Sequence, residues 1–501
     1  MGRSRQGRCV VRSATIRGVE ALPVDVEVAV GSGLPAIEIV GMPDAAIQEA
    51  RVRIKAACAA CGFEIPAARI VVNLAPGSLR KSGSGFDLPI AIGLLGATKQ
   101  IDPKIAQSNL IVGELSLDGL TRNVPGLLAF AFCAQREGLG LISAPTLERI
   151  PTIEGLTHWQ IRSLGALRTG ELTLAPKAQA VKWDTAPDFK DIAGHDAAKR
   201  ALQIAAAGGH GILLVGPPGS GKTMLASRLP SILPPLSHAE MLEAAVIHSV
   251  ASEPFGSILG GVRPFRAPHH SATLAGLVGG SRPLRPGEVT LAHNGVLFLD
   301  EIAEFKPSVL QAIRQPLESG EVCITRADGN VTFPARFSLV AASNPCPCGY
   351  FGDAEKPCTC NAAQVRRYQS RIGGPILDRI DMHLEVKRLS SSAVLDTGGG
   401  TDSATLRDGV LAGCAFRDWR LSKHPVDVTL GTSERLMRAC LLPDDARSFL
   451  EKAADSQQLS GRGVMRVLAV ARTIADLEES ERVGLGNICE ALSYRVSEGA
   501  M

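Results

Sequence analysis

The sequence is poor in aromatic residues, in net charge and in long apolar runs. Phe, Trp and Tyr make up 4% of its 501 residues, so it does not offer the aromatic platform on which single-stranded nucleic acid stacks. No apolar stretch reaches about 18 residues, which argues against a membrane-spanning helix. The basic N-terminus is not followed by an apolar segment, which argues against a secretory signal. A net charge of +3 leaves nucleic-acid binding open, because a groove or a ring needs only local positive charge.

The cysteines are distributed as in a reduced cytosolic protein. Eight of the 12 are scattered along the chain, which is the usage expected without structural disulfides. Cys58 and Cys61 form a C-x-x-C pair, but they lie in an Ala-rich segment that is predicted to be helical and to end at Gly62. We therefore interpret them as packing residues and not as a redox pair. We expect the protein to be cytoplasmic.

At 501 residues the chain is too long for one hydrophobic core, and its patterns predict a multidomain α/β protein. In the first part, VDVEVAV (24–30) alternates as a half-buried strand does, and a helix is predicted from Pro43 to Gly62 with Asp44 as its N-cap. The central part alternates helical and strand patterns, and the last part is helical. The predicted parts are an α+β domain at 1–175, a linker at 176–190, a central domain with a parallel sheet and helices at 191–388, a Ser- and Gly-rich linker at 389–405 and an all-α domain at 406–501.

A phosphate-binding motif lies in GILLVGPPGSGKTMLASRL (211–229), which reads as an apolar strand, a glycine loop and a helix. The glycines let backbone N–H groups close around phosphate oxygens. Lys222 would reach the β- and γ-phosphates of ATP, and the Thr223 hydroxyl would bind Mg²⁺. The residues of the motif are Gly216, Pro217, Pro218, Gly219, Ser220, Gly221, Lys222 and Thr223.

Two later strands end in polar residues that complete a nucleotide site. GVLFLDE (295–301) is apolar up to Asp300 and Glu301, so a buried parallel strand would place Asp300 at the metal and Glu301 as general base toward water. FSLVAASN (337–344) ends in Asn344, whose amide could orient that water or sense the γ-phosphate. Without the other two elements, Asn344 would be interpreted as a turn cap.

These elements resemble a known superfamily. Lys222-Thr223, Asp300-Glu301 and Asn344 follow the order of Walker A, Walker B and sensor 1 in AAA+ ATPases. Longer stretches resemble the magnesium-chelatase-like branch and, within it, the ComM/YifB family, in one order over nearly the whole chain. The stretches are GLPAIEIVGMPDAAIQEARVRIKAA, NLAPGSLRKSGSGFDLPIAIGLL, IAAAGGHGILLVGPPGSGKTMLA, PFRAPHHSAT, NGVLFLDEIAEF, RQPLESGEV, NPCPCGYFGD, GPILDRIDMHLEV and LSGRGVMRVLAVARTIADL.

The resemblance implies a hexameric ATPase that uses ATP and Mg²⁺ at sites shared between subunits. It assigns Arg379 in GPILDRID as the finger that reaches a neighbour's γ-phosphate, with Arg371 as the competitor. Arg462 in LSGRGVMR corresponds to sensor 2, a nucleotide-binding residue, and Arg466 is the second choice. A guanidinium suits the finger role because it spreads charge over transition-state oxygens. The chain has His195 and Gly211 where the family often has Gln and Asn, neither at a catalytic position.

The first domain resembles the fold of Lon-type proteases, which is also that of the recombination protein RadA. Proteolysis by this fold needs a Ser nucleophile and a Lys base. The resemblance places Gly85 at the serine position and Phe130 near the lysine position, with Ser82 and Ser84 close to the first. Because the second motif contains no lysine, we expect no proteolysis and predict a role in ring assembly or DNA handling.

No acidic residue lies between Pro254 and Gly287. Glycines and prolines predict a loop-rich projection, and charge of one sign suits a phosphate backbone. Packing against an acidic neighbouring subunit is the alternative. The arginines of this insertion are Arg263, Arg266, Arg282 and Arg285, and Lys81 and Arg80 of the first domain are further candidates for phosphate contact. His269 and His270 also lie in the insertion; in an extended segment they would point to opposite faces, so we predict structural or phosphate contacts and no shared metal ion.

VCITRADGNVTF (322–333) consists of two alternating runs around Asp328-Gly329, which predicts a β-hairpin with Arg326 near its tip. Its place before the sensor 1 strand resembles the pore hairpin of helicase-like AAA+ proteins, so six copies would line a channel and contact DNA.

Four cysteines are concentrated in SNPCPCGYFGDAEKPCTC (343–360). Cys346, Cys348, Cys358 and Cys360 form two C-x-C pairs around a turn-rich segment, and four thiolates can close a tetrahedral zinc site. We predict a structural zinc ion that stiffens the loop after Asn344; free thiols, an iron–sulfur cluster and a redox disulfide are the alternatives.

The sequence thus predicts an ATP-dependent motor acting on branched or single-stranded DNA in recombination or natural transformation, as the ComM/YifB resemblance implies. The alternative is a chelatase-type ATPase that remodels a protein partner. A nucleotide-gated scaffold without hydrolysis is disfavoured, because it need not keep Lys222, Asp300 and Glu301.

Overall fold

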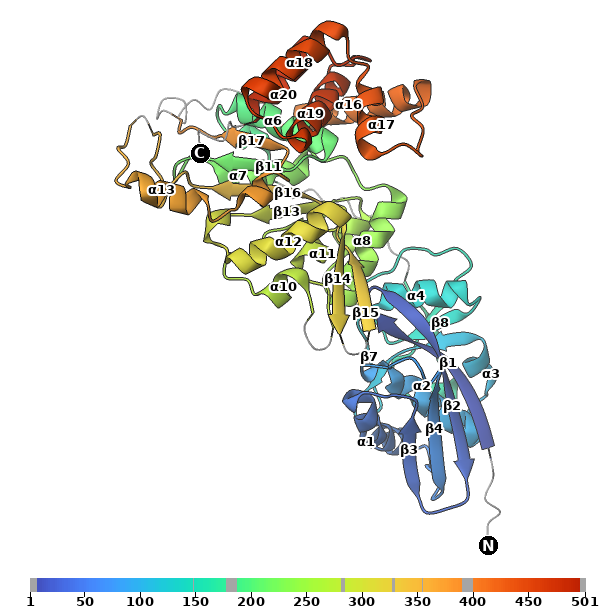
Figure 1. Cartoon of the computed structure of the whole chain (residues 1–501). Helices are drawn as coiled ribbons and strands as arrows, with labels where there is room; N and C mark the ends of the chain where they lie inside the picture. The colour runs from blue at the N-terminus through green and yellow to red at the C-terminus, as the bar shows by residue number, and fades with distance from the viewer. Residues whose placement is uncertain are drawn as a thin grey trace.

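The chain is arranged as three consecutive parts along one long axis, with the N-terminal part at one end and the C-terminal helices at the other (Figure 1). The structure is a computed structural model, and it describes residues 7–146, 148–176, 187–280, 284–326, 329–353, 355–389 and 400–495. Most of both predicted linkers lies outside the described residues. Within the described residues, no helix is both long and apolar enough to cross a membrane.

The N-terminal part is built on an eight-stranded mixed sheet in the order β10-β9-β8-β5-β1-β2-β4-β3. Its strands are β1 (Gly7–Arg17), β2 (Glu20–Gly31), β3 (Ala36–Val40), β4 (Arg69–Ala75), β5 (Asn109–Ile111), β8 (Gly140–Ser143), β9 (His158–Gln160) and β10 (Thr173–Leu174). A separate ribbon is formed by β6 (Glu114–Leu115) and β7 (Thr121–Arg122). The predicted alternation in β2 is confirmed, since Val24, Val26 and Val28 are buried while the residues between them are less so.

Helices cover this sheet, and their apolar residues form one buried core with those of the strands. They are α1 (Ala45–Ala60), η1 (Ser84–Phe86), α2 (Asp87–Ala97), α3 (Lys104–Gln107), α4 (Leu127–Arg136) and α5 (Ala166–Thr169). The predicted helix after Pro43 is confirmed as α1, and Asp44 is its N-cap, with its carboxylate accepting from the amide of Ile47 at 3.0 Å. Cys58 is fully buried, and burial raises the pKa of its thiol to about 12, as expected for a packing residue.

The central part contains a five-stranded, fully parallel sheet in the order β12-β13-β16-β11-β17. Its strands are β11 (Ile212–Val215), β12 (Phe265–Arg266), β13 (Gly295–Leu299), β16 (Phe337–Ser343) and β17 (Met382–Glu385). Every residue of β13 is buried, as is typical of a parallel strand with both faces covered. The predicted hairpin is confirmed as β14 (Glu321–Arg326) and β15 (Gly329–Pro334), which pair antiparallel.

One group of helices surrounds the central sheet, and a second group forms the C-terminal part. The first group is η2 (Phe189–Asp191), α6 (Asp196–Gly208), α7 (Lys222–Arg228), η3 (Leu229–Ser231), α8 (His238–Ala251), α9 (Gly256–Leu259), α10 (Leu274–Val278), α11 (Glu288–Leu291), η4 (Ile302–Glu304), α12 (Pro307–Ser319), α13 (Ala362–Gln369) and α14 (Gly374–Leu377). The second is α16 (Ser403–Lys423), α17 (Thr432–Cys440), α18 (Asp444–Ser456), α19 (Gly461–Leu477) and α20 (Leu485–Ser493).

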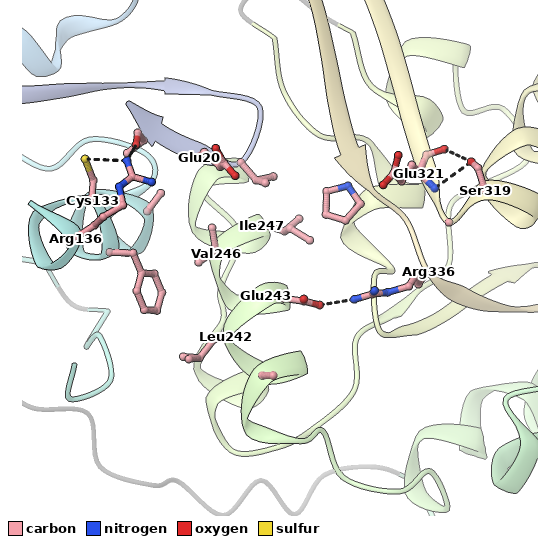
Figure 2. Close-up of a pocket in the computed structure, with 17 residues that line it drawn as sticks. Glu20, Cys133, Arg136, Leu242, Glu243, Val246, Ile247, Ser319, Glu321 and Arg336 are labelled. Atoms are coloured by element: carbon pink, nitrogen blue, oxygen red, sulfur yellow. Dashed lines mark hydrogen bonds and ion pairs between the residues drawn. The ribbon is translucent and has the colours of Figure 1, made fainter. Parts of the chain in front are cut away.

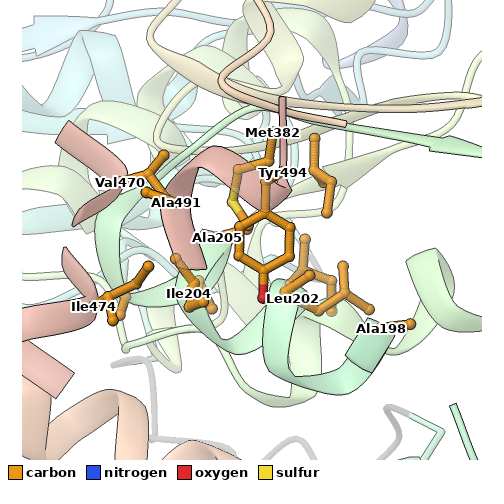
Figure 3. Packing of buried hydrophobic residues seen from close by; sticks show 14 of the residues in the cluster. Ala198, Leu202, Ile204, Ala205, Met382, Val470, Ile474, Ala491 and Tyr494 are labelled. Carbon is orange, nitrogen blue, oxygen red and sulfur yellow. The ribbon is translucent and has the colours of Figure 1, made fainter. Parts of the chain in front are cut away.

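The C-terminal helices share one hydrophobic core with the central part. Figure 3 shows α6 residues, including Leu202 and Ile204, packed with Val470 and Ile474 of α19. The two parts therefore do not pack as independent bodies. Because residues of the central sheet belong to the same buried cluster, a shift of α19 relative to α6 would change the packing against that sheet.

The N-terminal part packs on the central part through α4 and α8, whose apolar residues belong to one buried cluster. Beside this contact lies a cavity of about 620 Å³ between α4, α8, the β1–β2 turn and the base of the β14–β15 hairpin (Figure 2). An ion pair between Arg336 and Glu243, at 2.6 Å, lies in its wall. The turn also touches the hairpin, since Arg17 donates to the carbonyl of Asn330 at 3.4 Å.

Candidate nucleotide site

The phosphate-loop motif lies between β11 and α7, the strand and the helix that its pattern predicts. The shape of the loop requires its glycines. A Cβ on Gly216 would lie 2.1 Å from the carbonyl oxygen of Val386. Gly219 and Gly221 have φ values of +79° and +85°, a region that glycine adopts at little cost.

Lys222 is the first residue of α7, and its ammonium lies under the loop. It donates to the carbonyls of Gly216 at 2.7 Å and Pro217 at 3.0 Å, and to the side-chain oxygen of Asn344 at 3.2 Å. Burial lowers the pKa of Lys222, with Asp300 and Glu301 opposing the shift. The predicted sensor 1 residue is thus in direct contact with the predicted phosphate-binding lysine.

The two acidic residues after β13 face different neighbours. Asp300 accepts a hydrogen bond from the Thr223 hydroxyl at 2.8 Å, so the two predicted magnesium ligands lie side by side. The backbone of Glu301 has a φ of +50°, and its amide donates to Asp300 at 3.0 Å. Hydroxyl and carboxylate oxygens beside a phosphate loop are the ligands that Mg²⁺ takes together with phosphates, so this pair fits that ion.

Strand order explains why these distant residues meet. β11 pairs with β16, and β16 with β13, all parallel. The carboxyl ends of parallel strands lie at one edge of a sheet, where ligands of open α/β sheets bind. Ser343 is opposite Val215, and its carbonyl accepts from the amide of Gly216 at 3.2 Å. Residues 216, 300 and 344 therefore lie close together at the carboxyl edge of the sheet.

A histidine that the sequence does not connect to this site lies beside it. Nδ1 of His270 is 3.7 Å from the Glu301 carboxylate, and its ring packs edge-on against Phe305. The rings of His269 and His270 lie together, with centroids 4.0 Å apart. The expectation that they point to opposite faces is wrong, because the backbone turns here: Ala272 donates to the carbonyl of His269 at 2.9 Å. The adjacent histidines stand out in the sequence, but the contact between His270 and Glu301 depends on the fold and cannot be predicted from their spacing.

The four predicted cysteines come together at one point, and within the described residues theirs is the one cluster with metal-ligand geometry. The Sγ atom of Cys346 lies 3.3 Å from that of Cys348 and 3.7 Å from that of Cys358, and Cys348 and Cys358 are 3.5 Å apart. The Cys360 thiol lies within 4.8 Å of the others. The backbone amides of Tyr350 and Thr359 lower the pKa of the Cys348 thiol, whereas desolvation and the neighbouring cysteines raise the pKa of the Cys358 and Cys360 thiols. The cluster therefore favours one thiolate that the other thiols stabilise.

Comparison with known proteins agrees with this geometry. Residues 188–394 match the family described as "Magnesium chelatase, subunit ChlI", 26–146 match "Subunit ChlI of Mg-chelatase", and 400–495 match the C-terminal family of the same subunit. The protein YifB of Salmonella typhimurium is 41% identical over 97% of this chain and 96% of its own. The competence protein ComM of Haemophilus influenzae is 41% identical over 97% of both chains. This chain belongs to the ComM/YifB family of magnesium-chelatase-like proteins. A more distant relative, the magnesium-chelatase 67 kDa subunit of Chlorobaculum parvum, is 31% identical over 31% of this chain and 23% of its own.

The two arginines to which the ComM/YifB resemblance assigns roles meet on one carboxylate. Arg379 and Arg462 both pair with Glu318 at the end of α12, Arg462 at 3.6 Å. Among the described residues, their polar contacts are with Glu318 and the carbonyl of Pro375, not with the phosphate loop of the same chain. The Arg379 side chain is 8% exposed, whereas that of Arg462 is 69% exposed.

The second choices for these roles have other partners. Arg466 pairs with Asp381, and Arg371 pairs with Glu304 at 3.4 Å. Arg466 also donates to the carbonyl of Arg379 and so lies behind the predicted finger.

The arginines of the acid-free insertion differ in their surroundings. Arg263 pairs with Glu240 at 3.3 Å and donates to the carbonyl of Asn294 at 2.7 Å. Arg266 forms two hydrogen bonds to Glu288, at 2.6 and 2.8 Å, and reaches Glu253. Glu253 and Glu288 lie just outside the insertion and Glu240 lies in α8, so the charges of Arg263 and Arg266 are balanced within the chain. Arg285 is exposed, and Arg282 lies outside the described residues.

The hairpin that was predicted to contact DNA is braced by the N-terminal part. A Cβ on Gly18, in the β1–β2 turn, would lie 3.0 Å from Val331 of β15. The turn of the hairpin and the side chain of Arg326 lie outside the described residues.

The residues at the protease positions do not form a Ser–Lys pair. Gly85 and the buried Phe130 occupy those positions, and the Ser84 hydroxyl donates to Glu114. Lys81 is fully buried and donates to the carbonyls of Leu74, at 2.7 Å, and Pro76. The suggestion that Lys81 contacts phosphate is therefore wrong, because its buried ammonium donates hydrogen bonds to backbone carbonyls of its own chain. Arg80 beside it is exposed.

Proposed function

We propose that this protein is an ATPase whose hydrolysis drives helicase or branch-migration activity on branched or single-stranded DNA. One observation carries the ATPase part: Lys222 contacts Asn344 at 3.2 Å while Thr223, the next residue, contacts Asp300 at 2.8 Å. Two consecutive residues of the phosphate loop thereby join the ends of two other strands.

The chemistry follows from these positions. Lys222 balances the charge of the β- and γ-phosphates, and Thr223 and Asp300 would hold Mg²⁺, which when bound neutralises further phosphate charge. Glu301 accepts a proton from water as the water oxygen bonds to the γ-phosphorus. The bond from that phosphorus to the bridging oxygen breaks, and ADP and inorganic phosphate leave. Asn344 contacts Lys222 and so can report whether the γ-phosphate is present.

DNA as the substrate is supported by two features. The β14–β15 hairpin precedes the sensor 1 strand β16, and in a closed ring its copies would face the central channel. The name of the Haemophilus influenzae relative, competence protein ComM, favours a role in natural transformation or recombination. We place the protein in the cytoplasm as a homohexamer, in which Arg379 reaches the γ-phosphate of a neighbour and Arg462 senses nucleotide, with the Lon-like N-terminal domain supporting the ring.

A second candidate function is ATP-dependent remodelling of a protein partner. The pairing of Arg263 and Arg266 with Glu240 and Glu288 favours it, because charge already balanced within the chain attracts phosphate less. A relative over 31% of this chain is a magnesium-chelatase subunit.

We also propose that the cysteine cluster holds one zinc ion. Four thiolates at about 2.3 Å from zinc in a tetrahedron lie about 3.8 Å from one another. The three separations among Cys346, Cys348 and Cys358, 3.3, 3.5 and 3.7 Å, are close to that spacing. A set of four sulfur ligands leaves no open position, so the role is structural.

The deciding experiment is steady-state ATP hydrolysis with and without forked or four-way DNA, at several salt concentrations. Lys222→Ala is the control and should lose hydrolysis. Stimulation by DNA that fades with salt supports a DNA motor. Hydrolysis that no DNA changes would favour the protein-remodelling function, and the absence of hydrolysis beyond that of Lys222→Ala would contradict both.

A further inference from the structure

The cysteine cluster touches the phosphate loop directly. Gly349 follows Cys348 by one residue, and a Cβ on Gly349 would lie 2.5 and 2.6 Å from two ring carbons of Pro218. Pro218 is the third residue of the phosphate-loop motif. The segment between the two cysteine pairs therefore rests on the loop that would surround the phosphates, and only a residue without a side chain fits there.

A second contact ties the same two segments together. Arg388, three residues beyond β17, donates to the carbonyl of Pro218 at 3.0 Å. Its guanidinium lies 5.8 Å from the ring centre of Tyr350, and the ammonium of Lys356 lies 4.2 Å from the same ring centre. Tyr350 and Lys356 both belong to the segment between the cysteine pairs. Arg388 thus bridges this segment and the phosphate loop.

The third connection runs along the chain. Asn344 contacts Lys222, and Cys346 follows two residues later and is fully buried. Gly349 donates to the carbonyl of Cys346 at 3.0 Å, which closes the turn that leads to Pro218. The chain around the cysteine cluster therefore follows directly from Asn344 on one side and contacts the phosphate loop, at Pro218, through Gly349.

We propose that zinc at the four cysteines fixes the phosphate loop in its nucleotide-binding shape through the contact of Gly349 with Pro218, so that metal occupancy controls ATP affinity. The inference rests on the proposed zinc site. The described residues of this segment, 346–353 and 355–360, form no helix or strand, so metal–sulfur bonds would supply its rigidity. Without the metal, the segment between the cysteine pairs would be less rigid and would support the phosphate loop less well. Nucleotide binding would then have to order both segments, and the conformational entropy that this costs would lower the affinity for ATP.

The chain offers a matched pair of glycines for the test. Gly349 and Gly352 lie in the same segment with φ values of +85° and +78°, but a Cβ on Gly352 would meet nothing within 4 Å. Gly349→Ala and Gly352→Ala therefore introduce similar backbone strain, and only the first introduces a clash with Pro218. Both keep all four cysteines.

The experiment measures zinc per chain by elemental analysis and the affinity for a fluorescent ATP analogue with Mg²⁺, on the full chain purified without chelators. We expect near one zinc in the wild type and in both variants. Gly349→Ala should bind the analogue about tenfold more weakly, as overpacking at a tight contact costs, and Gly352→Ala should bind like the wild type. A chelator selective for zinc over magnesium should lower the affinity of the wild type for the analogue by a similar factor. The same chelator should lower the affinity of Gly349→Ala little further.

The outcomes separate this inference from the proposals on which it rests. A wild type that binds the analogue but contains no metal overturns the zinc site and the coupling, and leaves the ATPase proposal standing. A wild type that contains zinc and keeps its affinity after the zinc is removed overturns the coupling alone. This second comparison uses no variant, so it decides the matter even if Gly349→Ala does not fold.

Discussion

Among single residues, Glu301 has the surroundings that bear most directly on the chemistry. A non-glycine residue in the left-handed region costs about 1 kcal/mol or more and persists where its neighbours hold it. Here the Glu301 amide is held by Asp300 at 3.0 Å, and its carboxylate lies 3.7 Å from His270. The turn therefore separates the two carboxylates: Asp300 faces Thr223, and Glu301 faces His270. That separation suits one metal ligand and one base.

The Glu301→Gln substitution tests this division of roles. The amide keeps the shape of the side chain but cannot accept a proton, so we expect hydrolysis to fall at least ~100-fold while nucleotide binding is retained. Phosphate release and binding of a fluorescent ATP analogue measure the two effects. Glu304→Gln, three residues on and paired with Arg371 on the surface, is the control and should keep most activity. Undiminished turnover in Glu301→Gln would remove Glu301 from the mechanism.

At the scale of elements, the sequence correctly predicts those helices, strands and turns that are determined by nearby residues. The strand–loop–helix around Lys222, the buried strand before Asp300, the helix capped by Asp44 and the β14–β15 hairpin all follow from periodicity and turn residues within about 20 positions. The pairing of Arg266 with Glu288, by contrast, needs β12 to lie beside α11, and the contact of His270 with Glu301 needs the insertion to fold back over β13. Such contacts depend on tertiary packing, and no spacing rule in one sequence contains them.

The C-terminal helices contain an element-level feature of the same kind. Arg420 of α16 forms two hydrogen bonds with Asp476 of α19, at 2.8 and 2.9 Å, and Arg472 reaches the same carboxylate at 3.1 Å. All three side chains are nearly inaccessible to solvent. One buried carboxylate thus accepts hydrogen bonds from two buried guanidinium groups, and the Arg420 pair joins the two helices.

Asp476→Asn should destabilise the C-terminal helices strongly. The amide occupies the same volume but leaves two buried cations without a counter-charge, which costs about 3–5 kcal/mol. Hydrogen exchange of the α16 and α19 amides in the full chain should accelerate accordingly. Lys423→Met, which breaks an exposed pair with Glu481 at the end of α16, should cost less than ~1 kcal/mol. Similar exchange in the two variants would show that the buried pair contributes no more than a surface one.

For the whole molecule, the contacts between parts form one continuous path. The β1–β2 turn touches the hairpin, α4 shares a core with α8, and α6 shares a core with α19. The predicted finger and sensor 2 arginines meet at Glu318, away from the phosphate loop of their own chain. In the hexamer that we propose, a neighbouring subunit would bring its Arg379 to the nucleotide, which is the arrangement of a ring with heterologous interfaces.

Mixing inactive subunits tests that arrangement. Arg379→Ala keeps its own Lys222 but lacks the finger, whereas Lys222→Ala keeps the finger and cannot hold phosphate. Each variant alone should be inactive. In an equal mixture, about a quarter of the interfaces pair an intact phosphate loop with an intact finger, so up to roughly a quarter of the wild-type hydrolysis should return after subunit exchange. Arg371→Ala, which loses an exposed pair with Glu304, should keep most of its activity without any mixing. If the mixture stays inactive while both variants assemble with the wild type, Arg379 acts within its own chain, and the surface that contains Glu318 is not the face that completes the neighbouring site.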